Sequence, residues 1–147
     1  MKRSTNNLTA AFIFIVASVG WHPSFANEDA LEYRHDVFES SEYHIKAAFA
    51  IFLGKVPHSE HLVLHANALA DFGNMISALF PEGSEGGEAL PAVWEEPELF
   101  ASRLEEYRQA AAAFKLAASE DNKASIQTAL PALGQACKNC HDKFREE

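Results

Sequence analysis

Two cysteines and a histidine lie near the carboxyl end of the chain in an arrangement that can hold a porphyrin. Cys137, Cys140 and His141 form the pattern Cys-x-x-Cys-His. Residues three and four positions apart share one face of a helix, so both thiols can bond to the vinyl groups of one haem while the histidine binds its iron. The motif therefore predicts one covalently attached haem c per chain, with Cys137 and Cys140 as thioether residues and His141 as the proximal axial iron ligand.

Three other uses of this motif are open from the residues alone: a redox-active cysteine pair, a structural disulfide and half of a zinc site. A thioredoxin-like pair is expected beside a strand-helix-strand unit, and the sequence has no such pattern. A zinc site would need a second pair of ligands in addition to the two cysteines. We therefore adopt haem attachment as the interpretation.

Apolar residues recur at a helical period, and turn residues divide the chain into four segments. We expect helices at about 29–52, from about Ser59 to Pro81, at about 98–118 and at about 122–145. The first has an apolar residue at every seventh position: Leu31, Phe38, Ile45 and Phe52. Short connections between such segments predict an all-α fold, an antiparallel up-down-up-down four-helix bundle.

Three local signals refine this prediction. Gly54 and Pro57 should end the first helix, Ser59 is a candidate N-cap for the second, and Pro131 predicts a kink or a short break in the last. The segment 81–97 is rich in proline and glycine but also contains apolar residues, including Trp94. We expect it to be a long loop that packs on the core or on a cofactor as a lid.

The amino-terminal segment has the features of a secretory signal peptide. Lys2 and Arg3 precede a mostly apolar run at 8–19, and Ser24-Phe25-Ala26 is a small-x-small cleavage site. We expect residues 1–26 to be removed near Ala26 and residues 27–147 to form a single haem domain in the periplasm. A membrane anchor would need about 20 consecutive apolar residues, and the sequence shows no such run, so we expect no membrane association.

The charge balance is acidic. The chain has 12 lysines and arginines against 21 acidic residues, and loss of the leader would leave 10 against 21, a formal net charge of −11. Nucleic acid is therefore not an expected partner. An acidic surface could steer a basic periplasmic redox partner.

The haem motif and several other segments together resemble the cytochrome c′ family, the class II c-type cytochromes. The resemblance rests on residues 33–34, 54–57, 79–84, 90–94 and 137–145. It implies a five-coordinate, high-spin haem with a closed distal face that binds nitric oxide or carbon monoxide. It also implies a homodimer formed through the first two helices, and no enzymatic activity.

The resemblance also assigns roles to residues outside the motif. Phe38 stands at the family's distal position, where it would form an apolar wall over the iron, because phenylalanine has no lone pair for coordination. Arg34, one helical turn earlier, would approach a haem propionate or else be a solvated surface residue. Arg145 would lie beside the proximal imidazole, or else be an exposed charge at the end of the helix. Trp94 and Tyr107 would line the edge of the haem.

Four histidines outside the motif could also be taken for metal ligands. His58, His61 and His65 fall on one helical face at spacings that can bind a transition metal, although such residues are usually solvated. His35 could reach the iron as a sixth ligand only if the first helix were rotated from the aligned register.

Two functions compete on these grounds. The first is binding of nitric oxide or carbon monoxide by a five-coordinate haem, and the second is electron transfer. The alternative to a five-coordinate site is a low-spin electron carrier with a sixth side-chain ligand. Peroxidase-like catalysis is not expected, because the sequence has no recognisable distal histidine-arginine pair.

Overall fold

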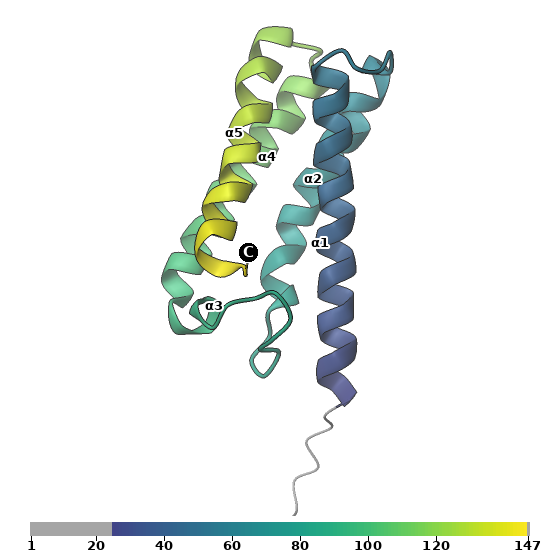
Figure 1. Cartoon of the computed structure of the whole chain (residues 1–147). Coiled ribbons are helices and arrows are strands. Elements are labelled where there is room, and N and C mark those ends of the chain that lie inside the picture. The colour runs from purple at the N-terminus through teal and green to yellow at the C-terminus, as the bar shows by residue number, and fades with distance from the viewer. Residues whose placement is uncertain (1–24, 147) are drawn as a thin grey trace, which may run out of the picture.

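The computed structural model describes residues 25–146, and four long helices dominate it (Figure 1). They are α1 (Phe25–Phe52), α2 (Leu62–Met75), α4 (Pro97–Ser119) and α5 (Lys123–Phe144). The short elements are two 3-10 helices, η1 (Ser59–His61) and η2 (Ile76–Leu79), and one α-helical turn, α3 (Ala92–Glu95). The long helices run up, down, up and down, which confirms the predicted antiparallel four-helix bundle.

The predicted signal segment lies outside the described residues except for its last two, which are in the first turn of α1. Between residues 25 and 146, no helix is long and apolar enough to cross a membrane.

Glycine ends α1 as the sequence predicts. Gly54 has a positive φ of 67°. Its amide donates to the carbonyl of Ile51, and the Lys55 amide donates to the carbonyl of Ala50, both at 2.9 Å. This pair of bonds is a Schellman motif, which satisfies the last carbonyls of a helix and favours glycine because it needs a left-handed residue.

One local prediction is wrong, and of the kink or short break predicted at Pro131 the break does not occur. Ser59 is not an N-cap: the chain enters α2 through η1, whose N-cap is His58, and no side chain caps either helix. Pro131 does not break α5, which is one continuous helix from Lys123 to Phe144. Pro131 and Gln127, whose carbonyl loses its helical donor, are both exposed, so water can satisfy that carbonyl without a break in the helix.

The apolar core lies between α2, α4 and α5, where the largest fully buried side chains are Leu69, Phe114, Leu130 and Leu133. The seven-residue apolar stripe of α1 behaves differently. Leu31, Phe38, Ile45 and Phe52 are only half-buried. The first three of these side chains line a large cavity instead of the core.

Candidate haem site

The cavity has a volume of about 710 Å³ and lies between α1 and α5, with further walls from α2, α4 and the segment before α3. Its volume falls within the range of roughly 300–1,000 Å³ that is typical of cofactor sites. The acidic residues that line it are all exposed, whereas its deeper lining is apolar: Leu69, Phe72, Ile76, Val93, Phe100 and Leu104 are buried. The site therefore has a polar mouth and a largely apolar interior, and such an interior suits the apolar ring of a porphyrin.

All three residues of the motif line this cavity, because α5 places Cys137, Cys140 and His141 on one face. The cysteines are free and half-buried. Burial raises the pKa of each thiol to about 11. A redox-active Cys-x-x-Cys pair needs a thiolate with a lowered pKa, so the environment of these thiols does not suit that alternative.

His141 is half-buried, and its pKa is lowered, first by burial and then by the positive charge of Arg145. Both effects favour the neutral imidazole, which is the form that ligates a metal. Arg145 also lines the cavity and is exposed. It is not simply a free charge, because its Nε donates to Glu88 Oε2 at 2.7 Å.

Phe38 on α1 lines the same cavity. Its ring packs edge-on against Phe72, with centroids 5.1 Å apart, and against Phe80, at 5.9 Å. His35 also lines the cavity but is exposed. Of Phe38 and His35, the two residues considered for the distal position, the phenylalanine is therefore the less exposed.

Arg34 is buried, and its guanidinium already makes hydrogen bonds within the protein. Only 6% of it is exposed, which contradicts the solvated alternative. Its guanidinium donates to the carbonyl oxygens of Gly86 at 2.7 Å and Ser84 at 3.0 Å. It also lies over the ring of Phe80, 4.8 Å from the centroid. Arg34 thus fixes the backbone of the segment 81–97, and burial lowers its pKa without removing its charge.

The segment 81–97 packs against the site, as predicted for a lid. We call residues 81–91 the lid. It contributes Gly87, Glu88 and Ala89 to the cavity wall. The Leu90 amide donates to the Phe144 carbonyl at 3.0 Å, and the Glu146 amide donates to the Glu88 carbonyl at 2.9 Å. The lid is therefore bonded on one side to α1 through Arg34 and on the other to the residues that follow His141.

Trp94, predicted at the edge of the haem, is not among the residues that line the cavity. Its ring lies behind Phe80, with centroids 6.1 Å apart, and 5.8 Å from the guanidinium carbon of Arg34. Tyr107 does line the cavity, and its hydroxyl donates to the Leu69 carbonyl at 2.9 Å.

Sequence reasoning did not single out several wall residues. The places of Phe72 and Phe100 in the cavity wall, and the pairing of Glu88 with Arg145, are not predicted from the sequence. The apolar spacing of the second and third helices could have indicated the two phenylalanines. No pattern in the sequence signals Glu88, because its role depends on the path of the lid.

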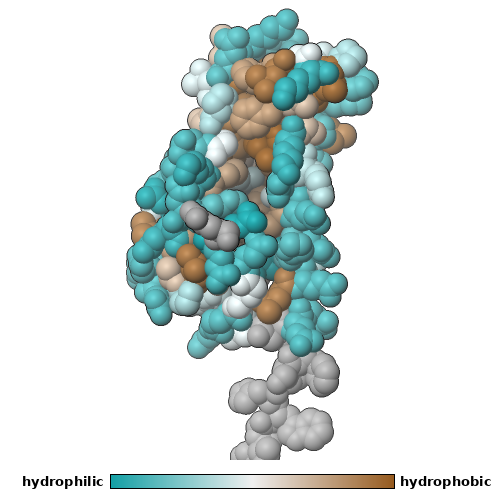
Figure 2. Space-filling model, viewed as in Figure 1, coloured by the Kyte–Doolittle hydropathy of each residue, from teal (hydrophilic) through white to brown (hydrophobic). Residues whose placement is uncertain are grey.

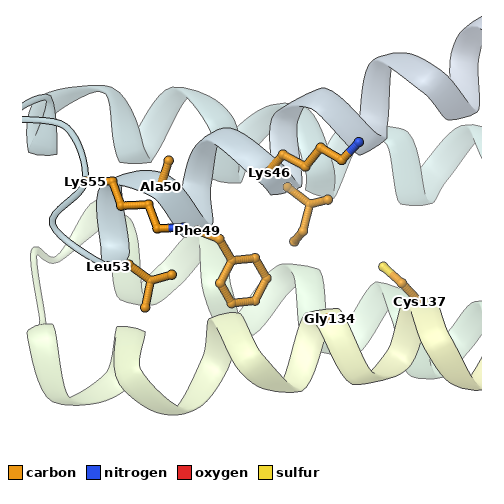
Figure 3. Close-up of a pocket in the computed structure, with 8 residues that line it drawn as sticks. Lys46, Phe49, Ala50, Leu53, Lys55, Gly134 and Cys137 are labelled. Carbon is orange, nitrogen blue, oxygen red and sulfur yellow. The ribbon is translucent and has the colours of Figure 1, made fainter.

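A second, shallower groove of about 500 Å³ runs between α1 and α5 and shares Cys137 with the main cavity. Figure 2 shows apolar surface gathered in the upper half of the bundle between these helices. Figure 3 shows Phe49 of α1 reaching towards Gly134 of α5, with Lys46 and Lys55 above the groove. The attachment cysteine therefore lies at the end of a groove that is open to solvent.

The donor set and the walls fit a covalently attached haem. Two neutral thiols and a neutral imidazole line one cavity, and the same face of α5 carries all three. A zinc site with these cysteines has no support: the one cluster of metal-binding side chains found between residues 25 and 146 is His58, Glu60 and His61.

Comparisons with known proteins agree with this fit. The family model described as cytochrome C′ matches residues 29–145. Cytochrome c′ of Pararhodospirillum photometricum is 37% identical over 122 residues, which cover 81% of this chain and 98% of that protein. The crystal structure of cytochrome c′ from Rubrivivax gelatinosus superposes with a TM-score of 0.75 at 30% identity, covering 80% of this chain and 95% of that one.

A nitric oxide complex of a cytochrome c prime variant from Alcaligenes xylosoxidans has the same fold, with a TM-score of 0.77 at 24% identity over 82% of this chain and 96% of that one. The family match spans nearly all the described residues and includes the whole attachment motif. The chain therefore belongs to the cytochrome c′ family, and its cofactor is a covalently bound c-type haem.

Proposed function

We propose that the protein is a periplasmic, non-enzymatic haem protein whose single five-coordinate, high-spin haem binds nitric oxide or carbon monoxide. Cys137 and Cys140 hold the porphyrin by thioether bonds, and His141 is the axial ligand. The observation that carries the proposal is that Phe38 lines the cavity and packs edge-on against Phe72 and Phe80. A benzene ring has no lone pair to donate, so the second axial position has no ligand from this residue.

The surroundings of Phe38 support the choice of gas. Phe72 and Phe80 pack around its ring, and neither carries a hydrogen-bond donor. Bound oxygen benefits from a distal donor, whereas nitric oxide and carbon monoxide depend on one less. The apolar rings around Phe38 therefore favour these two ligands over oxygen.

Two arginines support the cofactor in this proposal. Arg34 lines the cavity, so its positive charge can pair with a haem propionate while its hydrogen bonds hold the lid. Arg145 keeps positive charge close to His141, and its pairing with Glu88 fixes its position at the mouth of the cavity.

Absorption and resonance Raman spectra of the ferrous holoprotein test the proposal. We expect a five-coordinate, high-spin spectrum that changes on addition of nitric oxide or carbon monoxide. A six-coordinate, low-spin spectrum without added ligand would refute it and would support the alternative of an electron carrier with a sixth side-chain ligand.

Substitution of Phe38 sharpens this test. Phe38→Met introduces a thioether sulfur at the same position and should convert at least part of the protein to a six-coordinate, low-spin form. Phe38→Leu is the matched control, because it changes the shape of the side chain without adding a lone pair. If the two variants give the same high-spin spectrum, Phe38 does not face the iron.

Electron transfer is a second candidate function, favoured by the groove that reaches Cys137. This groove would bring one edge of the porphyrin close to solvent, where a redox partner could approach it. Stopped-flow reduction of the ferric holoprotein by periplasmic donor proteins tests this function. Negligible rates with each donor would leave gas binding as the function.

Export and assembly are also part of the proposal. We expect removal of residues 1–26, which an intact mass of the periplasmic product would show together with the mass of one haem. We expect a homodimer, supported by exposed apolar side chains at the end of α1 and the start of α2: Leu53, Val56, Val63 and Leu64. Sedimentation as a monomer at micromolar concentration would refute the dimer.

A further inference from the structure

The turn that leads into α2 carries three side chains with donor atoms close together. We propose that His58, Glu60 and His61 form a surface site for one divalent transition metal ion, separate from the haem cavity. One ligand atom from each residue lies within 4.8 Å of the others. None of the three lines the haem cavity. They come from the end of the α1–α2 connection and from η1.

The distances between these atoms are close to those of a metal site. Both His58 Nδ1 and His61 Nε2 lie 3.7 Å from the same oxygen, Glu60 Oε1. Metal–ligand bonds of about 2.0–2.1 Å in tetrahedral geometry put neighbouring ligand atoms about 3.3–3.4 Å apart. The two histidine–carboxylate distances therefore exceed the bound value by only a few tenths of an ångström, which small side-chain rotations can supply.

The 3-10 geometry of η1 explains why the side chains converge. A 3-10 helix has three residues per turn, so residues three apart lie directly above one another. His58 and His61 have this spacing, and the His61 amide donates to the His58 carbonyl at 3.0 Å. Their rings are stacked, with centroids 5.1 Å apart and an interplanar angle of 17°. The two imidazoles thus already face the same side of the turn as the carboxylate.

This ligand set differs from the one that the sequence suggests. His65 was grouped with His58 and His61 on the assumption of a regular α-helix. In the structure, His65 Nδ1 lies 2.9 Å from Nδ1 of His44 on α1, so His65 already has a partner. Glu60 takes its place in the cluster.

The chemistry of the donors indicates the class of ion. Two imidazole nitrogens and one carboxylate oxygen suit Zn²⁺, Cu²⁺ or Ni²⁺ better than Mg²⁺ or Ca²⁺, which prefer oxygen ligands. Three protein ligands leave a position for water, as in open zinc sites. The acidic chain attracts cations, whereas the positive end of the α2 dipole opposes them.

Titration of the holoprotein with ZnCl₂ tests the site, with isothermal calorimetry for affinity and native mass spectrometry for the number of ions. At pH 7.5 we expect one Zn²⁺ per chain. Glu60→Gln and His61→Gln should each weaken binding by about tenfold or more, since loss of even an outer-shell partner weakens metal sites by about 10–100-fold. Glu98→Gln, an exposed acid in the first turn of α4, is the matched control and should leave binding unchanged.

His65→Gln separates the proposed ligand set from the one based on helical spacing, and it should also leave binding unchanged. The proposal is overturned if the wild-type protein binds no zinc, if Glu60→Gln has no more effect than Glu98→Gln, or if His65→Gln abolishes binding. The haem absorption spectrum and the circular dichroism of each variant report whether it is folded, so a failure to fold is not confused with a loss of the site.

Discussion

Replacement of Arg34 by methionine should release the lid from α1 and destabilise the fold. The methionine keeps an unbranched apolar side chain against Phe80 but removes every guanidinium hydrogen bond. The Ser84 and Gly86 carbonyls would then lose their charged donor. Because Ser84 is only 3% exposed, its carbonyl cannot reach water unless the lid moves.

The magnitude follows from the two short bonds, at 2.7 and 3.0 Å. A hydrogen bond to a charged group contributes about 1.5–3 kcal/mol, so the two together contribute at least about 3 kcal/mol. Relief of the desolvation of the buried charge offsets part of this loss. We therefore expect Arg34→Met to lower the free energy of unfolding by about 2–3 kcal/mol. Arg34→Lys should lose about half as much, because an ammonium keeps the charge but not the planar fork.

Guanidinium chloride unfolding of the holoprotein, followed by far-UV circular dichroism, measures this loss, and limited proteolysis reports cleavage within the lid. Lys115→Met is the control, because Lys115 is an exposed cation on α4 and its loss should change stability by less than about 0.5 kcal/mol. A loss below about 1 kcal/mol for Arg34→Met, with no faster cleavage of the lid, would show that Arg34 does not hold the lid.

Three other substitutions have expected outcomes, all measured by chemical unfolding. Gly73→Ala should cost about 1–3 kcal/mol, because its Cβ would lie 3.1 Å from the buried ring of Tyr107, which a hydrogen bond fixes; no loss would mean that this ring can shift. Gly134→Ala should raise the free energy of unfolding by about 0.5 kcal/mol, because alanine is the better helix former. The added Cβ would lie 3.3 Å from the Phe49 ring, which borders an open groove and can move away. A clear loss of stability would contradict this. Burial, and then the neighbouring histidines, lower the pKa of His65 in the folded protein. Stability should therefore fall as the pH drops below about 6.5, the ordinary pKa of histidine, because the unfolded chain then binds the proton more readily. His65→Gln, measured in the presence of EDTA, should make that fall less steep.

The helices could be predicted from the sequence because their signals are local. The third expected helix, at 98–118, corresponds to α4 at Pro97–Ser119, and the fourth, at 122–145, to α5 at Lys123–Phe144. The periodicity of apolar residues and the residues that cap helices act over one or two turns, so they can be read without the fold. A four-residue element such as α3 is too short to show a period, and it was taken as loop.

The site could be predicted only in part, for the same reason. The shared face of Cys137, Cys140 and His141 follows from helical spacing, and so does the joint exposure of Arg34 and Phe38 to the cavity. The bonding partners of Arg34 could not be predicted, because they are 50 and 52 positions away in a loop whose path has no periodic signal.

The apolar stripe on α1 follows the predicted helical spacing, but what it packs against could be found only from the structure. The seven-residue spacing correctly placed Leu31, Phe38 and Ile45 on one face, but that face lines the cavity rather than the protein core. Apolar periodicity indicates a face that avoids water, and it does not distinguish side-chain packing from a cofactor.

The attachment of the lid at both ends has a mechanical consequence. Gly86 is bonded to Arg34 on α1, and Glu88, two residues later, is bonded to Arg145 and Glu146. Three consecutive residues thus tie the first helix to the terminus of the last. A force applied to the final turn of α5 would be transmitted to α1 through these three residues before the two long helices had to separate.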